Sequence, residues 1–248
     1  MAMLVTRPQP DGDVTAATLR ARGYEVLLAP MLRFEPVPFQ DDPEANYGGV
    51  IVTSANALRA IEAQPGMARL LKLPLFAVGK HTAKAARDAG FSKVIVANGD
   101  AAALRDKVVE TVRDRKLKKA GTLLYLAGAD LSRDLAGELR EDGFNVVMQT
   151  TYKMIPVANL PSEVCEAFAA NGIEAVLHYS RRSAHSFVDA TRASGIEISA
   201  LAIPQFCLSE AVSDVVREAG ATQVTVARTP DESALFEALD RALSPLSR

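Results

Sequence analysis

The sequence predicts an α/β fold of two doubly wound domains, each with a parallel β-sheet between layers of helices. Three observations favour this fold. Short runs of Val, Ile and Leu alternate with helical periods that end at Gly, a series of three such segments occurs twice, and 48% of the 248 residues are hydrophobic while 23% are charged. Alternating strands and helices are typical of α/β layers, and this length allows two domains of roughly 120 residues, each with its own core.

The first repeated segment, A, covers positions 4–37 and recurs 120 positions later, at 124–157, as segment A′. Each copy starts with an apolar run typical of a buried parallel strand, and a helical period that ends at Gly follows. In the first copy we expect a helix over 14–22 that directs Val14, Ala17 and Leu19 toward the sheet and ends before Gly23. Residues that recur identically in A′ include Leu19, Arg20, Gly23, Val26, Pro36 and Val37.

Two further segments recur in the same order. Segment B, at 50–61, matches 176–187 with Ser54 aligned to Ser180, and segment C, at 76–97, matches 206–227. In segment C we expect a helix over 82–89 that ends at Gly90 and a strand over 93–97. The chain therefore has the order A-B-C-A′-B′-C′, which favours parallel sheets with right-handed crossovers.

The residues do not decide which segments share a sheet. One arrangement pairs A with B and C, and the other exchanges the A segments, so that A joins B′ and C′ while A′ joins B and C. Residues 36–46 are rich in Pro and acidic residues and are expected to form an exposed linker, and 156–161 is a second expected crossing point. Both lie at the ends of A segments.

Composition and motifs exclude several classes of function. The formal net charge of −2 argues against nucleic-acid binding through overall basicity. Cys165 and Cys207 form no metal-ligand spacing and are expected to be buried thiols, and His178, within a predicted strand, is expected to be an interior or sheet-edge residue. Phosphate loops and the HExxH and GxSxG motifs are absent, and no apolar run has the length of a signal peptide or membrane span, so we expect a soluble cytoplasmic protein.

Candidate binding residues follow the predicted strands. In open α/β sheets, ligands bind beyond the carboxyl ends of the strands, where helix N-termini favour anions. Hydroxyl, Gly and basic residues predominate at these turns and suit an anionic ligand, although Ser54, Thr82, Ser180 and Ser209 are also typical helix caps. The turns are Thr6-Arg7-Pro8, Thr53-Ser54-Ala55-Asn56, Gly79-Lys80-His81-Thr82, Ala127-Gly128-Ala129, Ser180-Arg181-Arg182-Ser183 and Ser209-Glu210.

The same turns carry a resemblance to a known family. The succession LVTRP, IVTSANALRA, FAVGKHTAKAARDAGF, LYLAGADLSRDLAGELREDGFNV with Tyr152 after it, and HYSRRSAHSF resembles uroporphyrinogen-III synthase over essentially the whole chain. The resemblance implies two flavodoxin-like domains joined by a two-stranded connection, with the A segments exchanged. The implied boundaries are 1–36 with 158–248 for one domain, 46–149 for the other, and connections at 37–45 and 150–157.

The resemblance also implies the reaction. The family closes the linear tetrapyrrole hydroxymethylbilane to uroporphyrinogen III with inversion of ring D and loss of water, through a spiro intermediate, and uses no metal or organic cofactor. The tyrosine of the family falls on Tyr152, whose phenol is expected to hydrogen-bond the leaving hydroxyl. The substrate contacts carried over are Thr53, Ser54, Gly79, Thr82, Ser180 and Ser183.

Charge considerations complete the predicted site. The substrate carries acetate and propionate groups, so Arg7, Lys80, Arg181 and Arg182 are expected to attract it, and Gly128 lies at a further strand end. The turn at Ser209 departs from the family pattern, because Glu210 would repel a carboxylate and Val212 replaces the expected threonine. We expect a monomer that binds neither nucleic acid nor membranes. A module that binds an anion without chemistry is the alternative, and product analysis with hydroxymethylbilane separates the two.

Overall fold

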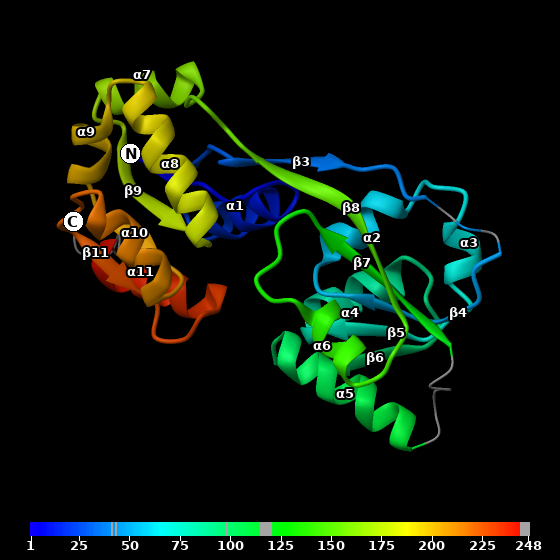
Figure 1. The fold of residues 1–248 in the computed structure, drawn as a ribbon. Helices are drawn as coiled ribbons and strands as arrows, with labels where there is room; N and C mark the ends of the chain where they lie inside the picture. Colours follow the sequence, from blue (N-terminus) through cyan, green and yellow to red (C-terminus); the bar gives the residue numbers. More distant parts are fainter. Residues whose placement is uncertain (41, 43, 98, 115–120, 244–248) are drawn as a thin grey trace. The chain divides into compact units, whose positions relative to one another are not determined.

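The chain folds into two compact units. The computed structural model describes residues 1–40, 42, 44–97, 99–114 and 121–243. We call Met1–Phe34 with Ile155–Arg248 domain 1 and Glu35–Met154 domain 2 (Figure 1). The predicted limits of the connections, 37–45 and 150–157, stay a prediction, and Asp41 and Pro43 within the first lie outside the described residues.

Domain 1 contains a five-stranded sheet in the order β11-β10-β9-β1-β2. All neighbouring strands in it are parallel. Numbered along the chain, this order is 2-1-3-4-5, which is that of flavodoxin-like folds. The strands are β1 (Ala2–Val5), β2 (Glu25–Leu28), β9 (Ile173–His178), β10 (Gln205–Cys207) and β11 (Val224–Val226).

Domain 2 repeats this order with its strands in a different chain sequence. Its sheet has the order β3-β8-β7-β4-β5-β6, and the pairs from β8 to β6 are parallel. If β7 is counted as the first strand, the five strands from β8 to β6 again read 2-1-3-4-5, with β3 added at the edge. The strands are β3 (Leu32–Pro36), β4 (Tyr47–Val52), β5 (Leu75–Val78), β6 (Val94–Ala97), β7 (Thr122–Gly128) and β8 (Val146–Pro156).

The strand pairs confirm the exchange of the A segments. Val5 of segment A pairs with Leu28 and Leu177 in domain 1, whereas Ile51 of segment B pairs with Phe76 and Tyr125 in domain 2. The chain therefore passes between the two domains along β3 and β8, which are neighbours in the sheet order.

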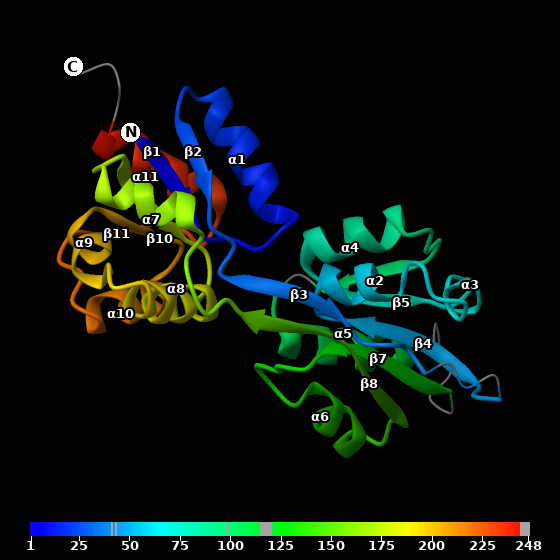
Figure 2. The same cartoon turned by 90° about the horizontal axis from the view of Figure 1, so that it is seen from above.

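Helices cover both faces of the domain 2 sheet because successive residues of each buried strand point to opposite sides. Val50 and Val52 pack with α2, α3 and α4, while Ile51 packs with α5 and α6. Figure 2 shows α2 and α4 on one side of this sheet and α6 on the other. The helices are α2 (Ala55–Ile61), α3 (Met67–Leu70), α4 (Gly79–Asp88), α5 (Ala101–Arg113) and α6 (Leu135–Glu141).

Domain 1 has the same three layers. Met3 and Val5 face α1 and α11, while Leu4 faces α7, α8 and α9 on the other side. Cys207 packs with α8 and α10. The helices are α1 (Asp11–Ala21), α7 (Ser162–Ala169), α8 (Arg181–Ala193), α9 (Glu197–Ala202), α10 (Glu210–Glu218) and α11 (Glu232–Leu243).

The predicted starts of the helices in segments A and C, at 14 and 82, are both wrong. Helix α1 starts at Asp11, and Val14 and Ala17 are exposed while Leu19 is buried. The predicted inward set fails because Ala17 and Leu19 lie about 200° apart around a helix. The buried stripe has the i, i+3, i+4, i+7 spacing instead and consists of Gly12, Thr15, Ala16 and Leu19.

Helix α4 begins at Gly79 rather than at Thr82, so Thr82 lies inside the first turn and is not a cap. Gly79 has a φ of +71°, a conformation that a side chain disfavours, and this residue turns the end of β5 directly into the helix. Ser54 and Ser180 do cap their helices, whereas Ser209 precedes α10 without a side-chain cap bond.

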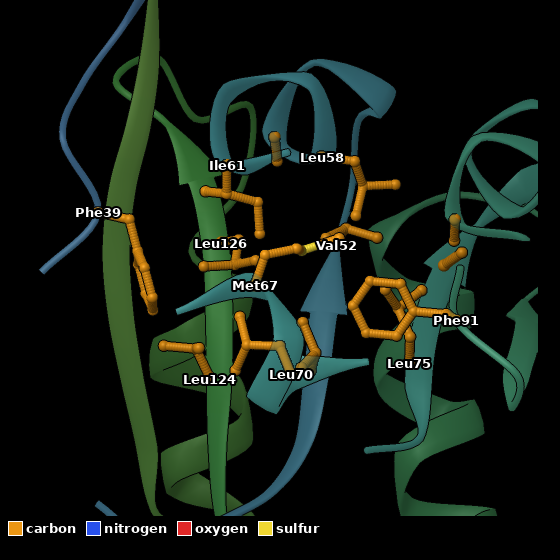
Figure 3. Packing of buried hydrophobic residues seen from close by; sticks show 14 of the residues in the cluster. Phe39, Val52, Leu58, Ile61, Met67, Leu70, Leu75, Phe91, Leu124 and Leu126 are labelled. Atoms are coloured by element: carbon orange, nitrogen blue, oxygen red, sulfur yellow. The ribbon is translucent and has the colours of Figure 1, made fainter. Parts of the chain in front are cut away.

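The expected exposed linker at 36–46 is wrong at one residue. Phe39 is buried and packs in the core cluster that includes Leu124 and Ile61 (Figure 3). Its backbone N–H donates to Gln64 Oε1 at 2.6 Å. The two thiols also differ: Cys207 is buried as expected, but Cys165 is half-buried, and both are free.

Candidate functional site

Domain 2 has a pocket of about 250 Å³ at the carboxyl ends of its strands. Thr53 follows β4, Val78 ends β5 and Gly128 ends β7. Strands β7 and β4 are neighbours and are strands 1 and 3 of the 2-1-3-4-5 order, and flavodoxin-like sheets bind ligands between these two strands. The pocket is lined by Thr53, Val78, Asp100, Ala101, Tyr125, Gly128, Asp130, Leu131, Ser132, Arg133 and Tyr152. Three residues predicted from the sequence, Thr53, Gly128 and Tyr152, therefore meet here.

Gly128 provides the space for the ring of Tyr152. The two residues are opposite each other in the β7–β8 pair, and the N–H of Ala129 donates to the Tyr152 carbonyl at 2.9 Å. A Cβ atom at position 128 would lie 2.7 Å from Tyr152 Cζ and 2.8 Å from its hydroxyl oxygen. The absence of a side chain therefore lets the phenol lie against the end of β7, and Tyr152 lines the pocket there.

The hydroxyl of Thr53 pairs with the hydroxyl of Tyr125 in the same pocket. Its Oγ1 atom lies 3.1 Å from the hydroxyl of Tyr125, a residue of β7 that is only 2% exposed. The Tyr125 ring packs in the core below α5 and α6, and burial raises the pKa of its phenol. Sequence reasoning missed Tyr125, because a tyrosine within an apolar strand is typical of the core. The feature that could have indicated it is the hydroxyl of Tyr125, which is the polar side-chain group in the run LLYLAG just before a predicted strand end.

Charged groups of both signs line the pocket. Asp100 caps α5 and accepts hydrogen bonds from the N–H groups of Ala103 and Ala102, and these bonds lower the pKa of its carboxyl. The positive end of the α5 dipole therefore already faces a carboxylate. Arg133 is the basic residue of the pocket lining, and its Nε donates to Glu138 Oε1 at 2.5 Å. Sequence reasoning missed both Asp100 and Arg133, because neither belongs to the strand-end turns that it selected.

The remaining predicted residues of domain 2 are next to this pocket in sequence but do not line it. Ser54 accepts a hydrogen bond from Asn56 N at 3.2 Å and so acts as the cap of α2. Gly79 directly follows the pocket residue Val78, Lys80 is exposed, and Thr82 is only 5% exposed. No side chain caps α4 within the described residues, so its first N–H groups remain available to a ligand.

The predicted residues of domain 1 form two separate groups. Arg7 follows β1, and its guanidinium donates to Glu232 Oε1 at 3.1 Å and to Thr15 Oγ1 at 3.2 Å. It also lies 3.6 Å from Asp11 and 4.9 Å from the centre of the Tyr179 ring. Arg7 thus ties α1 and α11 to the end of β9, and its charge is offset by two carboxylates.

The second group is the turn that begins α8. Ser180 accepts a hydrogen bond from Ser183 N at 3.1 Å and donates to Ser183 Oγ at 3.0 Å. Ser183 is buried, while Arg181 and Arg182 are both exposed at the first turn of the helix. This turn therefore combines two exposed cations with the positive end of a helix, an arrangement that suits an anion.

The turn before α10 lacks this character. Glu210 pairs with Arg217 at 3.0 Å and accepts a hydrogen bond from Ser213, and these partners lower the pKa of its carboxyl. Val212 is 4% exposed and packs in an apolar cluster of domain 1. The departure from the family pattern at this turn is thus accompanied by a local role for both residues.

His178 is an interior residue, as predicted. Gln205 Nε2 donates to the carbonyls of Ala200 and Ile203, so Gln205 presents its Oε1 to His178 Nε2 at 2.9 Å. Nε2 therefore carries the imidazole hydrogen. His178 Nδ1 is buried without a partner in the described part of the chain, and burial lowers the pKa of the ring to about 4.

Neither a metal-binding cluster nor a membrane-spanning helix occurs among the described residues. His, Cys, Asp and Glu side chains form no cluster there that could hold a metal ion. The helices in the described ranges are all too short or too polar to cross a membrane.

The comparisons with known proteins agree on one family. The family model for uroporphyrinogen-III synthase HemD matches residues 13–237. A crystal structure of uroporphyrinogen-III synthetase from Helicobacter pylori has a TM-score of 0.65 at 18% identity, with 98% of this chain and 99% of that chain covered. A mutant uroporphyrinogen III synthase from the extremely thermophilic bacterium Thermus thermophilus has a TM-score of 0.55 at 17% identity, with the same coverage. No curated protein sequence is a significant match. The likeness to solved structures shows a shared fold, and the family match over most of the sequence shows that this chain belongs to the uroporphyrinogen-III synthase family.

Proposed function

We propose that the chain closes hydroxymethylbilane to uroporphyrinogen III, with inversion of ring D and release of water, and so acts as a cyclising hydro-lyase of tetrapyrrole and heme biosynthesis. Membership of the family supports this function. The observation that carries it is the placement of Tyr152 against Gly128 beside Thr53, in a pocket at the ligand-binding end of an α/β sheet.

The reaction requires few acid or base residues from the protein. Loss of the hydroxymethyl oxygen gives an electron-poor azafulvene, and the electrons that expel the oxygen come from the adjacent pyrrole of the substrate. Attack by the substituted carbon of ring D forms a spiro intermediate, whose fragmentation and second closure invert that ring. The protein has to hold the two ends of the substrate together and help water leave.

Tyr152 supplies that help in our proposal. Its phenol is half-buried at the pocket and donates a hydrogen bond to the leaving hydroxyl as the carbon–oxygen bond breaks. Because Gly128 leaves the ring no obstacle, the hydroxyl reaches the pocket without displacement of β7. Positioned acid assistance of this kind accelerates a reaction by roughly 10²- to 10⁴-fold.

The size of the pocket limits what it holds. At about 250 Å³ it is smaller than typical sites for drug-sized ligands, which are roughly 300–1,000 Å³. We infer that it receives one end of the linear tetrapyrrole, the ring that bears the leaving hydroxyl, and not the whole molecule.

The acetate and propionate groups of the substrate require donors and positive charge. We propose that Thr53, Ser54 and the start of α4 bind carboxylates of the ring held in domain 2, with Gly79, Lys80 and Thr82 in that first turn. The turn at the start of α8, with Ser180, Arg181, Arg182 and Ser183, is the corresponding proposed anion site of domain 1. Arg7 contributes less, because Glu232 and Asp11 already pair with it.

We also propose that the enzyme works in the cytoplasm as a monomer. The substrate and product are polycarboxylates that dissolve in water, and both sequence and fold are those of a biosynthetic enzyme family.

Isomer analysis tests the function directly. Purified protein is mixed with freshly prepared hydroxymethylbilane, and the porphyrinogens are oxidised and separated. Spontaneous closure gives the type I isomer, so we expect type III to predominate when the protein is present. Type I alone, formed at the rate of the protein-free control, would contradict the proposal. Saturable binding without type III product would favour the anion-binding module instead.

A further inference from the structure

Tyr125 reaches the pocket from the core below it. Its ring packs with Leu104, Val108 and Leu139 in the layer under α5 and α6, and the residue is 2% exposed. Only the hydroxyl extends to the polar end of the sheet, where Thr53 Oγ1 lies 3.1 Å away. A phenylalanine would fill the same apolar space, so packing does not account for the hydroxyl.

The surroundings decide which oxygen donates. In the part of the chain that the structure describes, Thr53 Oγ1 is the hydrogen-bond partner of the Tyr125 hydroxyl. If Thr53 donated to Tyr125, the hydrogen of the Tyr125 hydroxyl would have no acceptor among the described residues, and at 2% exposure the residue has little access to water, so this arrangement costs free energy. If Tyr125 donates, the Thr53 hydrogen is directed away from Tyr125, and Thr53 is a half-buried residue that lines the pocket. The second arrangement leaves no buried donor without an acceptor.

We propose that Tyr125 is a positioning residue for substrate binding: it donates to Thr53 Oγ1, and this fixes the Thr53 hydroxyl as a donor to a carboxylate oxygen of the ring held in the pocket. The proposal rests on the function proposed above. A phenol is protonated throughout the neutral pH range, and burial raises the pKa of Tyr125 further, so the donor persists there.

A double-mutant cycle measures this coupling. Tyr125→Phe, Thr53→Val and the double variant are compared with the unchanged chain in KM and kcat for hydroxymethylbilane. We expect Tyr125→Phe to raise KM roughly 5- to 10-fold with kcat within about 2-fold, which corresponds to one lost hydrogen bond in the bound state. We expect no further rise in KM when Tyr125→Phe is added to Thr53→Val, because the residue acts through Thr53.

Two controls separate positioning from general stability. Thr53→Ser keeps the hydroxyl, so KM is expected to remain near that of the unchanged chain, and Tyr125→Phe is expected to raise KM again in this background. Tyr24→Phe removes another phenol bond, from Tyr24 to Asp240 Oδ1 at 2.8 Å in domain 1, and is expected to change neither KM nor kcat. Urea unfolding of each variant confirms that it is folded.

Each other outcome overturns the proposal. An unchanged KM in Tyr125→Phe, or an equal rise in KM with and without the Thr53 hydroxyl, would reduce Tyr125 to a core residue. Loss of cooperative unfolding in Tyr125→Phe would assign the hydroxyl to stability. If the unchanged chain forms type III product but the KM effects of Tyr125→Phe and Thr53→Val multiply in the double variant, only the positioning role of Tyr125 fails. If the unchanged chain forms no type III product, the proposed function fails as well.

Discussion

Replacing Gly128 with alanine tests how closely the pocket depends on the position of Tyr152. The added Cβ would lie 2.7 Å from Tyr152 Cζ, whereas ordinary contacts begin at 3.4 Å, so the ring has to retreat by about 0.7 Å. Gly128 is not among the glycines with positive φ, so alanine fits the backbone itself. The perturbation therefore acts on the phenol and not on the course of β7.

The expected effect on catalysis is large and the effect on folding is small. A displacement near 1 Å of a reacting group can lower a rate by about 10²-fold, so we expect Gly128→Ala to lower kcat by roughly 10- to 100-fold. The free energy of unfolding should change by about 1 kcal/mol or less, because a lower entropy of the unfolded chain offsets part of the contact strain. Type III formation is followed at saturating substrate, and unfolding is followed in urea.

A second comparison isolates the contact. If Gly128→Ala acts only through the phenol, it should have no effect on kcat when Tyr152→Ala has already removed the ring. Gly172→Ala serves as the matched control in domain 1, where the three atoms nearest to the new Cβ all belong to Ala167 and lie at 3.3 Å or more. Full activity in Gly128→Ala, or an equal loss in the Tyr152→Ala background, would refute the role assigned to this close approach.

Three further predictions concern chemistry, charge and pH. Tyr152→Phe should lower kcat on the order of 10²-fold with folding nearly intact, and unchanged turnover would reduce Tyr152 to packing. KM should rise with ionic strength, and joint neutralisation of Arg181 and Arg182 should raise it further; a salt-independent KM together with no effect of that double change would remove the electrostatic account. The folded-state pKa of His178 is about 4 against 6.5 for an ordinary histidine, so the unfolded chain takes up a proton first as pH falls. Stability should therefore be lost between about pH 6.5 and 4, by up to roughly 1.4 kcal/mol per pH unit, and urea unfolding of His178→Gln should show a smaller pH dependence.

The order of strands and helices could be predicted because each repeat carries its own local signals. Apolar runs of strand length followed by helical periods depend on nearby residues alone, and the structure has a strand followed by a helix in both copies of each segment. A Gly follows the end of each of these helices except α2, which ends at Ile61. The exchange of the A segments could not be predicted this way. A parallel strand such as β1 is buried on both faces, so its apolar residues fit either sheet equally well, and only the resemblance to a family selected the pairing.

The predicted starts of α1 and α4 failed for local reasons, but other details failed because they depend on geometry across the chain. Phe39 lies in a stretch whose Pro and acidic residues indicate a linker, yet it fills a gap beside Leu124. Thr53, Gly128 and Tyr152 were found because strand ends and family motifs mark them. Tyr125 was missed, because a tyrosine close to a strand end is only a weak local signal and does not show that its hydroxyl reaches a pocket.

The two copies of segment B show how far a repeat constrains a site. Thr53 and Tyr179 occupy equivalent positions, each after the third strand of a 2-1-3-4-5 sheet. In domain 2, Thr53 borders a pocket of about 250 Å³. In domain 1, Arg7 lies 4.9 Å from the centre of the Tyr179 ring and pairs with Glu232 at 3.1 Å. A substrate carboxylate would have to compete with Glu232 for Arg7. The repeat reproduces the backbone but not these side chains, which is why our proposal assigns the positive charge that domain 1 offers to the substrate to the start of α8.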